Sequence, residues 1–271
     1  MARERVTITI KKDLLLQVDR LVDGLTIRSR SQAVEYLLSK FLSDFRLKNA
    51  LVLAGGEKKD ILFGKKIKFL EMLNGKTLLQ HVLDGISGFN MNNFLVYVDN
   101  FGSEIVKDMN SRNLPYKINF LKGDNASGTI APLQSAREQL NDTFLVAYGD
   151  TLCDLNINEM LAFHRKNKCI ATIALTTVSN PKDYGVVSME GNRVREFIQK
   201  PKKDVPSYLV SAGYFLLEPE IFRHISRNMR SLEKDLFPKL AKKNLLNGYV
   251  FQGRYVNVNS KSDLEKARVF L

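Results

Sequence analysis

Residues 49–76 read NALVLAGGEKKDILFGKKIKFLEMLNGK, and this segment decides the fold. Its apolar run, Ala50 to Ala54, predicts a buried parallel strand. The run leads into Gly55 and Gly56, where the missing side chains allow backbone N–H groups to approach a ligand closely. Positive charge follows the glycines at Lys58, Lys59, Lys65, Lys66 and Lys68. These features suit a phosphate-binding turn, and the glycine pair alone fits a plain strand-to-helix connection equally well.

The segments that follow alternate between strand-like and helix-like patterns. A helical pattern from Leu78 to Ile86 precedes strands at 94–98 and 116–121, and a helix at 103–113 lies between those strands. This alternation predicts an α/β fold with a doubly wound, mixed but mostly parallel sheet, whose ligands bind at the carboxyl ends of the strands. Further strands are expected at 143–148, 170–178, 184–187, 193–198 and 208–217, the later ones partly antiparallel.

Two further segments carry chemistry at the same edge of the sheet. Asp150 follows the strand at 143–148, and a carboxylate there suits a divalent cation beside a phosphate, although Gly149-Asp150 also fits a simple turn. The small residues of Ala126–Pro132 open a helix and leave N–H groups and space for a flat ring. An ordinary helix cap would explain them too.

The order of these motifs resembles the sugar-1-phosphate nucleotidyltransferase family, and the resemblance extends from residue 49 to the end of the sequence. It implies an enzyme that joins an NTP to a sugar-1-phosphate, releases pyrophosphate and uses Mg²⁺. The resemblance assigns the metal to Asp150 and Asn257. It assigns catalysis to Lys68, Lys200 and Asp150, the nucleotide to Ala54, Gly55, Gly56, Gly128 and Thr129, and the sugar to Gly185, Gln199, Gly213 and Glu233. Where the family has a catalytic arginine, we expect Lys58 or Lys59 to supply the charge, with Lys59 as the catalytic candidate.

The sequence departs from the family pattern at several places. The family carries glycine, threonine and arginine after its glycine pair, where this chain has Glu57-Lys58-Lys59, so the arginine that clamps the triphosphate is absent. Gln199 replaces a glutamate, and Asn257 replaces the final metal-binding aspartate. The alternative function is therefore a catalytically weak sensor of a nucleotide or nucleotide sugar that acts as a transcriptional regulator.

Residues 1–46 predict a separate module in front of the nucleotidyltransferase domain at 47–271. The alternation from Arg5 to Ile10 predicts a half-buried strand, and the apolar spacing from Leu14 to Leu25 predicts a first helix. Ser29 and Gln32 form a capping box, which predicts the start of a second helix. So small a unit cannot bury its apolar faces alone, so we expect an obligate dimer and hence a homodimer or higher even oligomer.

This order of elements resembles the ribbon-helix-helix DNA-binding module. The resemblance implies that the polar face of the strand, Arg5, Thr7 and Thr9, meets base edges, while Ser29 and Arg30 lie near the DNA backbone. The ten basic and six acidic residues up to Lys48 agree with DNA as a partner. A pure dimerisation arm is the alternative.

The composition sets outer limits on function. A net charge of +12 in 271 residues favours polyanionic partners, either nucleic acid or nucleotide phosphates, and also simply aids solubility. With Cys153 and Cys169 as the only cysteines, no apolar signal segment and no stretch able to span a bilayer, we expect a cytoplasmic protein with no membrane partner. The three histidines lack ligand-like spacing, so no zinc site is expected.

Overall fold

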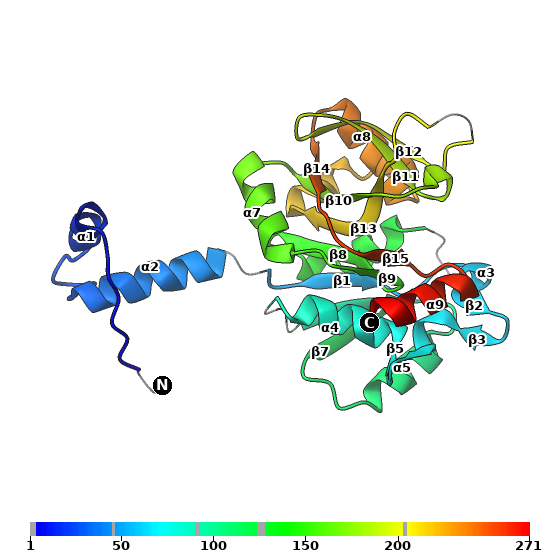
Figure 1. Cartoon of the computed structure of the whole chain (residues 1–271), viewed down its shortest axis with the longest axis horizontal. Helices are drawn as coiled ribbons and strands as arrows, with labels where there is room; N and C mark the ends of the chain where they lie inside the picture. The colour runs from blue at the N-terminus through cyan, green and yellow to red at the C-terminus, as the bar shows by residue number, and fades with distance from the viewer. Residues whose placement is uncertain (1–3, 45–46, 90, 92, 124–127, 203–204) are drawn as a thin grey trace. The chain divides into compact units, whose positions relative to one another are not determined.

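The computed structural model describes residues 4–44, 47–89, 91, 93–123, 128–202 and 205–271. The chain packs as two units, Met1–Arg46 and Leu47–Leu271 (Figure 1). Within the described ranges, no helix is both long enough and apolar enough to cross a lipid bilayer.

The larger unit is built on a nine-stranded sheet with the order β10-β14-β12-β11-β13-β8-β1-β6-β7. Its strands are β1 (Ala50–Leu53), β6 (Asn93–Val98), β7 (Lys117–Lys122), β8 (Phe144–Tyr148), β10 (Ala171–Thr177), β11 (Gly185–Glu190), β12 (Arg193–Gln199), β13 (Leu209–Leu217) and β14 (Leu246–Val250). Its helices include α4 (Leu78–Ser87), α5 (Gly102–Asn110), α6 (Ile130–Ser135), α7 (Ile157–Asn167), α8 (Phe237–Lys242) and α9 (Lys261–Phe270).

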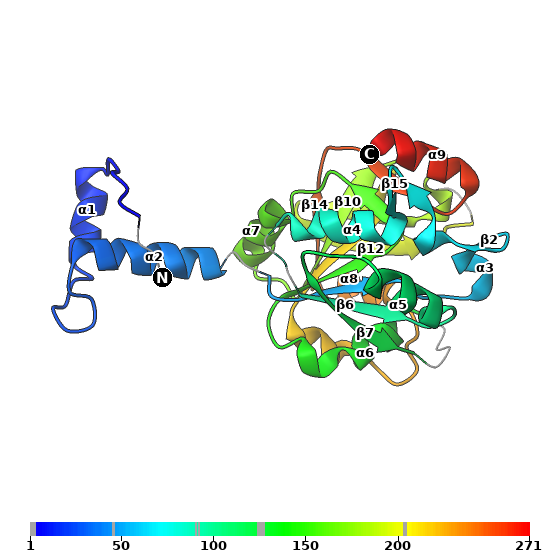
Figure 2. The same cartoon turned by 90° about the horizontal axis from the view of Figure 1, so that it is seen from below.

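The parallel half of the sheet confirms the predicted strand at the glycine turn. All four residues of β1 are buried, and β1 pairs in parallel with β6 on one side and β8 on the other. Ala50 and Val52 pack on one face with side chains of α4, α5, α7 and α9, whereas Leu51 and Leu53 pack on the other with α6 and α8. Figure 2 shows α4 and α9 above this sheet and α6 below it. Because both faces are covered, the strand is apolar throughout.

The second half of the sheet corrects the expectation of a mostly parallel arrangement. β8 and β13 are antiparallel, and so are the pairs β10–β13, β11–β12 and β11–β13. A tight turn joins β11 to β12 at Gly191, where φ is +55°, and so short a connection can only join antiparallel neighbours. The prediction of a mixed α/β sheet is confirmed, but its predominantly parallel character is wrong.

Several short elements line the carboxyl edge of this sheet. After β1 the chain forms one helical turn, α3 (Lys58–Ile61), and the small ladders β2–β3 and β4–β5. After β8 it forms β9 (Thr151–Cys153), which pairs antiparallel with β15 (Tyr255–Asn257) from near the end of the chain. Ser231 caps the helical turn η5 (Leu232–Leu236), since its Oγ accepts hydrogen bonds from the N–H groups of Glu233 and Lys234.

The smaller unit contains the two predicted helices but not the predicted strand. Its helices are α1 (Lys12–Asp19) and α2 (Arg30–Asp44), joined by an ion pair in which Arg30 Nε lies 2.5 Å from Asp19 Oδ1. Ser29 Oγ accepts a hydrogen bond from Gln32 N–H, so the predicted cap is present. Residues 4–11 lie outside any strand, so the expected strand at Arg5–Ile10 is wrong for a single chain. A β-strand needs a neighbouring strand for its hydrogen bonds, and one copy offers none here.

The apolar side chains of this unit are largely exposed. Val6 is 74% exposed and Ile8 57% exposed, so these two side chains do not contribute to a half-buried strand in the single chain. The large apolar side chains that are likewise exposed in this unit are Leu14, Leu16, Leu25, Tyr36, Leu37 and Leu38. Arg5, Thr7, Thr9, Ser29 and Arg30, the predicted DNA contacts, are also exposed.

Candidate active site

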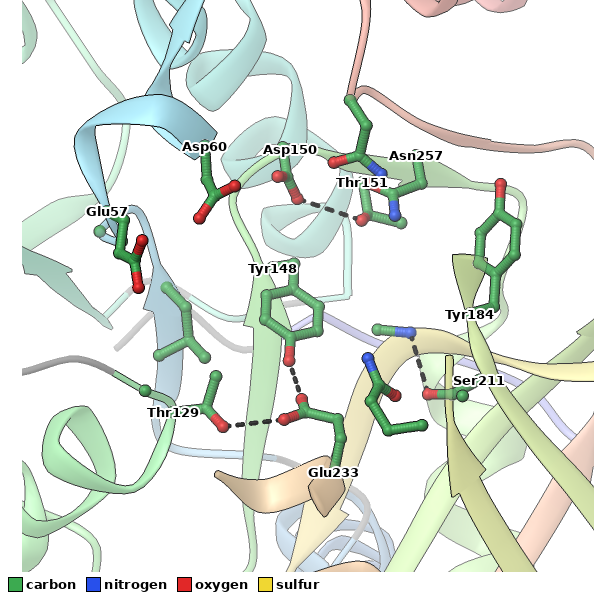
Figure 3. Close-up of a pocket in the computed structure, with 18 of the residues that line it drawn as sticks. Glu57, Asp60, Thr129, Tyr148, Asp150, Thr151, Tyr184, Ser211, Glu233 and Asn257 are labelled. Atoms are coloured by element: carbon green, nitrogen blue, oxygen red, sulfur yellow. Dashed lines mark hydrogen bonds between the residues drawn. The ribbon is translucent and has the colours of Figure 1, made fainter. Parts of the chain in front are cut away.

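A pocket of about 410 Å³ opens at the carboxyl ends of β1, β6 and β8, within the range usual for small-molecule sites. It extends towards the antiparallel half of the sheet, where β11, β12 and β13 contribute to its wall (Figure 3). The predicted site residues that line it are Gly55, Gly56, Lys68, Gly128, Thr129, Asp150, Gly185, Gln199, Lys200, Gly213, Glu233 and Asn257.

The glycine turn after β1 is held by the end of β6. The N–H of Gly56 donates to both carboxylate oxygens of Asp99, at 2.9 and 3.0 Å, and Asn100 Nδ2 donates to the carbonyl of Gly56 at 3.0 Å. A Cβ at Gly55 would lie 2.9 Å from the Asp99 carboxyl carbon, so any larger residue there would displace the Asp99 carboxylate. Ala54, predicted to bind nucleotide, is fully buried beneath the turn, and the pocket lining does not include it.

The loop after the glycines places acidic residues in the pocket where lysines were expected. Glu57 and Asp60 line the pocket, as Figure 3 shows, whereas Lys58 and Lys59 do not. Lys59 Nζ lies 2.7 Å from Glu57 Oε2, and its side chain is 74% exposed. Lys59, predicted to be catalytic, is therefore not part of the pocket lining in this structure.

Lys68 and Asp150, which both line the pocket, form a largely buried ion pair. Lys68 Nζ lies 2.5 Å from Asp150 Oδ2, and the two side chains are 6% and 14% exposed. A buried ammonium group requires such a counter-charge, because desolvation without one costs several kcal/mol. Thr151 Oγ1 donates to the other carboxylate oxygen at 3.3 Å. The pair therefore presents a lysine and a carboxylate to the same point of the pocket.

Asn257 lies beside this ion pair, as predicted. It stands opposite Thr151 in the β9–β15 ladder, and the N–H of Val258 donates to the carbonyl of Asp150 at 2.9 Å. Asn257 Oδ1 is a buried oxygen with no hydrogen-bond partner in the structure. An unpaired amide oxygen next to a carboxylate suits a hard cation, which prefers oxygen ligands. Within the described part of the chain, no three His, Cys, Asp or Glu side chains gather as a metal cluster.

Glu233 connects two walls of the pocket through hydrogen bonds. Its carboxylate accepts hydrogen bonds from Thr129 Oγ1 at 2.9 Å and Ser231 Oγ at 2.8 Å, and from the hydroxyl of Tyr148 (Figure 3). Burial raises the pKa of Glu233 from 4.5 to about 7, because the charged form is poorly solvated there. The residue predicted to bind the sugar is thus a buried acid shared by several hydroxyl groups.

The backbone reinforces this connection between Thr129 and η5. Thr129 Oγ1 accepts from the N–H of Leu232 at 2.7 Å, and the N–H of Ile130 donates to the carbonyl of Arg230 at 3.0 Å. A Cβ on Gly128 would lie 2.1 Å from that carbonyl oxygen, so only glycine fits. We refer to this contact between residues 128–130 and 230–233 as the α6–η5 seam.

The opposite end of the pocket is formed by the antiparallel strands. A Cβ on Gly185 would lie 2.3 Å from the Phe197 ring and 2.9 Å from Gln199 Oε1, so the glycine makes room for both side chains. Gln199 Oε1 is buried without a hydrogen-bond partner in the structure, and the N–H of Lys200 donates to the carbonyl of Tyr184 at 2.9 Å. This end therefore offers an unpaired acceptor beside a lysine.

The region that contains these groups corresponds to a known family. A family model described as nucleotidyl transferase matches residues 49–268. The chain belongs to the nucleotidyl transferase family. Its fold is shared by HddC from Yersinia pseudotuberculosis, with a TM-score of 0.72 and 18% identity, over 83% of this chain and 99% of that chain.

Curated relatives of this nucleotidyl transferase are mannose-1-phosphate guanylyltransferases. The catalytic subunit beta of Danio rerio is 28% identical over 229 residues, which cover 79% of this chain and 62% of the relative. Mannose-1-phosphate guanylyltransferase 1 of Arabidopsis thaliana is 29% identical over 232 residues, with the same coverage of 79% and 62%. The chain spans about 60% of the length of the curated relatives it matches.

Sequence reasoning missed several residues that line the pocket of this nucleotidyl transferase. Asp60, Asp99 and Tyr148 lie in the wall, as do Thr151, Asp183, Tyr184 and Tyr255. Asp99 carried a usable signal, because it is the first polar residue after the buried strand β6, in the same position as Asp150 relative to β8. Tyr184 and Tyr255 gave no local signal, since their rings meet, with centroids 6.2 Å apart, only when distant segments fold together.

Proposed function

We propose that this chain transfers a nucleotidyl group from an NTP to a sugar-1-phosphate and releases pyrophosphate. The observation that carries the proposal is the convergence of Lys68, Asp150 and Asn257 in one pocket that Lys200 and Gln199 also line. The names of the curated relatives make GTP and mannose-1-phosphate the first substrates to test.

In this reaction an oxygen of the acceptor phosphate attacks the α-phosphorus of the nucleotide. The bond from that phosphorus to the oxygen bridging to the β-phosphate breaks, and pyrophosphate leaves with the bonding electrons. Lys68 stabilises negative charge on the transferred group, and Lys200 orients the acceptor phosphate. Gly185, Gly213 and Gln199 shape the place of the sugar, and Gln199 Oε1 accepts from a sugar hydroxyl.

A magnesium ion fits this arrangement. Asp150 and the unpaired Oδ1 of Asn257 would hold it, together with phosphate oxygens and water. When bound, the ion supplies positive charge beside the transferred phosphoryl group. Because Asn257 is neutral, the site has one negative charge fewer than a pair of aspartates would have. We therefore expect it to bind the metal more weakly than such a pair.

Pyrophosphate release, measured with a panel of NTPs and sugar phosphates, tests the proposal. Robust turnover is expected to fall by about 10²–10³-fold in Asp150→Ala, the size of effect typical for loss of a charge-stabilising group. Asp142→Ala is the matched control, because this carboxylate pairs with the exposed Lys48 outside the pocket. Absence of turnover with every substrate pair, or equal turnover in both variants, would contradict the proposal.

A second candidate function is favoured by the acidic phosphate loop. Glu57 and Asp60 line the pocket where a triphosphate would need positive charge, and no arginine from 57–60 replaces the missing clamp. These features support a domain that binds a nucleotide or nucleotide sugar, catalyses poorly and acts as a sensor for a transcriptional regulator. Saturable binding of a nucleotide sugar without pyrophosphate release would favour this candidate over the enzyme.

For the smaller unit, we propose a dimeric ribbon-helix-helix module that binds DNA. The proposal is supported by the exposed apolar side chains of residues 4–38, which a second copy would cover, and by the exposed Arg5, Thr7 and Thr9. In the dimer, residues 5–10 of the two copies would pair as antiparallel strands. Ser29 and Arg30 would lie near the phosphates of the DNA.

A gel-shift series at increasing salt tests this module. Binding is expected to weaken steeply with salt, because Lys and Arg contacts release counterions from DNA. Deletion of residues 1–44 is expected to abolish the shift. No shift at low salt with a broad pool of DNA fragments would leave a dimerisation arm as the function of this unit.

A further inference from the structure

The pocket residues follow the order of the strands along the sheet, and this order assigns a place to each part of the nucleotide. Ser211 and Gly213 belong to β13, Asp150 follows β8, Gly55 follows β1 and Asp99 follows β6. In the sheet these strands are consecutive, in the order β13-β8-β1-β6. Asp99 therefore lies at the end of the row opposite to the proposed acceptor site.

The proposed reaction fixes how the nucleotide lies along this row. Its α-phosphate must be near Lys68 and Asp150, with the acceptor towards β11, β12 and β13. The ribose and base are then directed the other way, across the glycine turn and towards β6. Gly55 and Gly56 have no side chains to obstruct a flat ring, and Tyr97, Asp99 and Gly128 also line the pocket. The base would then lie on the side of the pocket that the Asp99 carboxylate lines.

A carboxylate discriminates among the bases by its lack of hydrogen-bond donors. Both oxygens accept, so the best partner is an edge with two adjacent donors. Guanine has such an edge, with N1–H beside the N2 amino group. Adenine and cytosine place a ring-nitrogen acceptor next to their amino group, and uracil and thymine flank N3–H with two carbonyl oxygens. The other bases therefore bring at least one acceptor against the carboxylate.

We infer that Asp99 is the residue that selects guanine in this pocket. The inference rests on the proposed function, which it deepens by naming the base of the nucleotide donor. Asp99 is half-buried, and its two oxygens share the single N–H of Gly56, so lone pairs remain on both oxygens for a base. The shared contact also fixes the carboxylate rigidly beside the glycine turn.

Asp99 also anchors the glycine turn, and the test has to separate the two roles. Asp99→Asn keeps a carbonyl oxygen that can accept from Gly56 N–H, so the anchor is preserved. The new amide group, however, donates where the carboxylate accepted. Xanthine has a carbonyl oxygen in place of the guanine amino group, so an amide matches xanthine as a carboxylate matches guanine.

The experiment measures the affinities of GTP, ITP, XTP and UTP for the full chain by calorimetry. The unaltered protein is expected to prefer GTP over ITP, which lacks only the N2 amino group, by about 10- to 100-fold. Asp99→Asn is expected to lose that preference and to bind XTP at least about tenfold better relative to GTP. Asp183→Asn, which changes a carboxylate elsewhere in the pocket lining, is the control for base preference.

The outcomes separate this inference from the proposed function. Binding of nucleotides without a preference for GTP over ITP in the unaltered protein overturns the role of Asp99 and leaves the transferase proposal standing. An unchanged base preference in Asp99→Asn does the same. Failure of the unaltered protein to bind any of the four nucleotides overturns both. If Asp99→Asn does not fold, the lack of a preference for GTP over ITP in the unaltered protein still overturns the inference.

Discussion

At the scale of single residues, the pocket is organised by buried ionisable groups that depend on specific polar partners. Lys68 is buried with Asp150 as its counter-charge, and Glu233 is buried among hydroxyl groups. Groups of this kind cost free energy when unpaired, so they respond strongly to substitution and to pH. Their behaviour can therefore be measured in stability as well as in activity.

Removing one member of the buried ion pair is expected to destabilise the fold. Asp150→Ala leaves the Lys68 ammonium buried without a counter-charge and should lower the unfolding free energy by about 3 kcal/mol. Adding Lys68→Met to that variant should restore part of the loss. Urea unfolding of the single and double variants gives the coupling energy. Lys76→Met, in a more exposed pair with Asp84, is the control and should cost no more than about 1 kcal/mol. Strictly additive effects of the two substitutions would rule out the coupling.

The raised pKa of Glu233 predicts a pH-dependent stability. The folded state holds the proton up to a pKa of about 7, whereas the unfolded chain releases it near 4.5. The contribution to stability is therefore complete below 4.5 and is lost as the pH rises through 7, amounting to about 3 kcal/mol. The difference in unfolding free energy between the unaltered protein and Glu233→Gln, followed from pH 4.5 to 7.5, isolates this group. A difference that stays constant over this range would contradict the prediction.

At the scale of elements, the short helix α3 shows what local sequence could and could not predict. Strand β1 and the carboxylate after β8 were predictable, because an apolar run and the polar residue that ends it are local signals. The positions of Lys58 and Lys59 were not. In one helical turn, residues three apart share a side, and Glu57 and Asp60 take the side that faces the pocket. Ile61 is buried, and its packing fixes which side of this helical turn faces the pocket. For that reason the loop presents acidic side chains, and not lysines, to the pocket.

This arrangement of α3 predicts a gain of function by a single substitution. Asp60→Arg replaces a carboxylate in the pocket wall with a guanidinium group that can bind phosphate oxygens in a bidentate manner. Affinity for an NTP should rise by about tenfold or more, while affinity for the corresponding nucleoside should stay the same. Lys59→Arg is the control, because this side chain is exposed and outside the pocket lining. Equal affinities for the NTP in Asp60→Arg and Lys59→Arg would contradict this account of the loop.

The N-terminal strand marks a second limit of sequence reasoning. Its alternating pattern is genuine, but a pattern states only which side chains would share a face once a neighbour pairs with the strand. In the single chain residues 4–11 have no such neighbour, and Val6 and Ile8 are exposed. By contrast, the order in which the pocket residues lie along the sheet follows from the strand order alone. Asp99 itself follows a buried strand, as Asp150 does, but its position beside the glycine turn became known only when β6 was found next to β1.

At the scale of the whole molecule, the distribution of exposed apolar side chains predicts assembly. Of the large apolar side chains that are exposed among the described residues, most belong to the unit of 46 residues at the N-terminus. The surface of a stable monomer rarely carries so many together. A second copy of the same unit is the partner we expect.

Light scattering tests this assembly on the full chain. The unaltered protein is expected to be a dimer or a higher even oligomer at micromolar concentration. Ile8→Lys, which places a charge where two strands would pair, should shift the mass towards the monomer. Thr7→Lys adds the same charge on the opposite face of the strand and should leave the mass unchanged. A monomeric mass for the unaltered chain would contradict the prediction.

The α6–η5 seam has a consequence for how molecules enter and leave. Gly128 and the Arg230 carbonyl are already in contact, and Thr129 and Glu233 are hydrogen bonded. We therefore expect this wall of the pocket to be rigid. When the pocket opens and closes, the α6–η5 seam is therefore expected to stay fixed while the other walls move relative to it. Substrate and product are then expected to pass through the side of the pocket opposite the seam. Substitutions on that side should change the rate of product release more than substitutions in the seam.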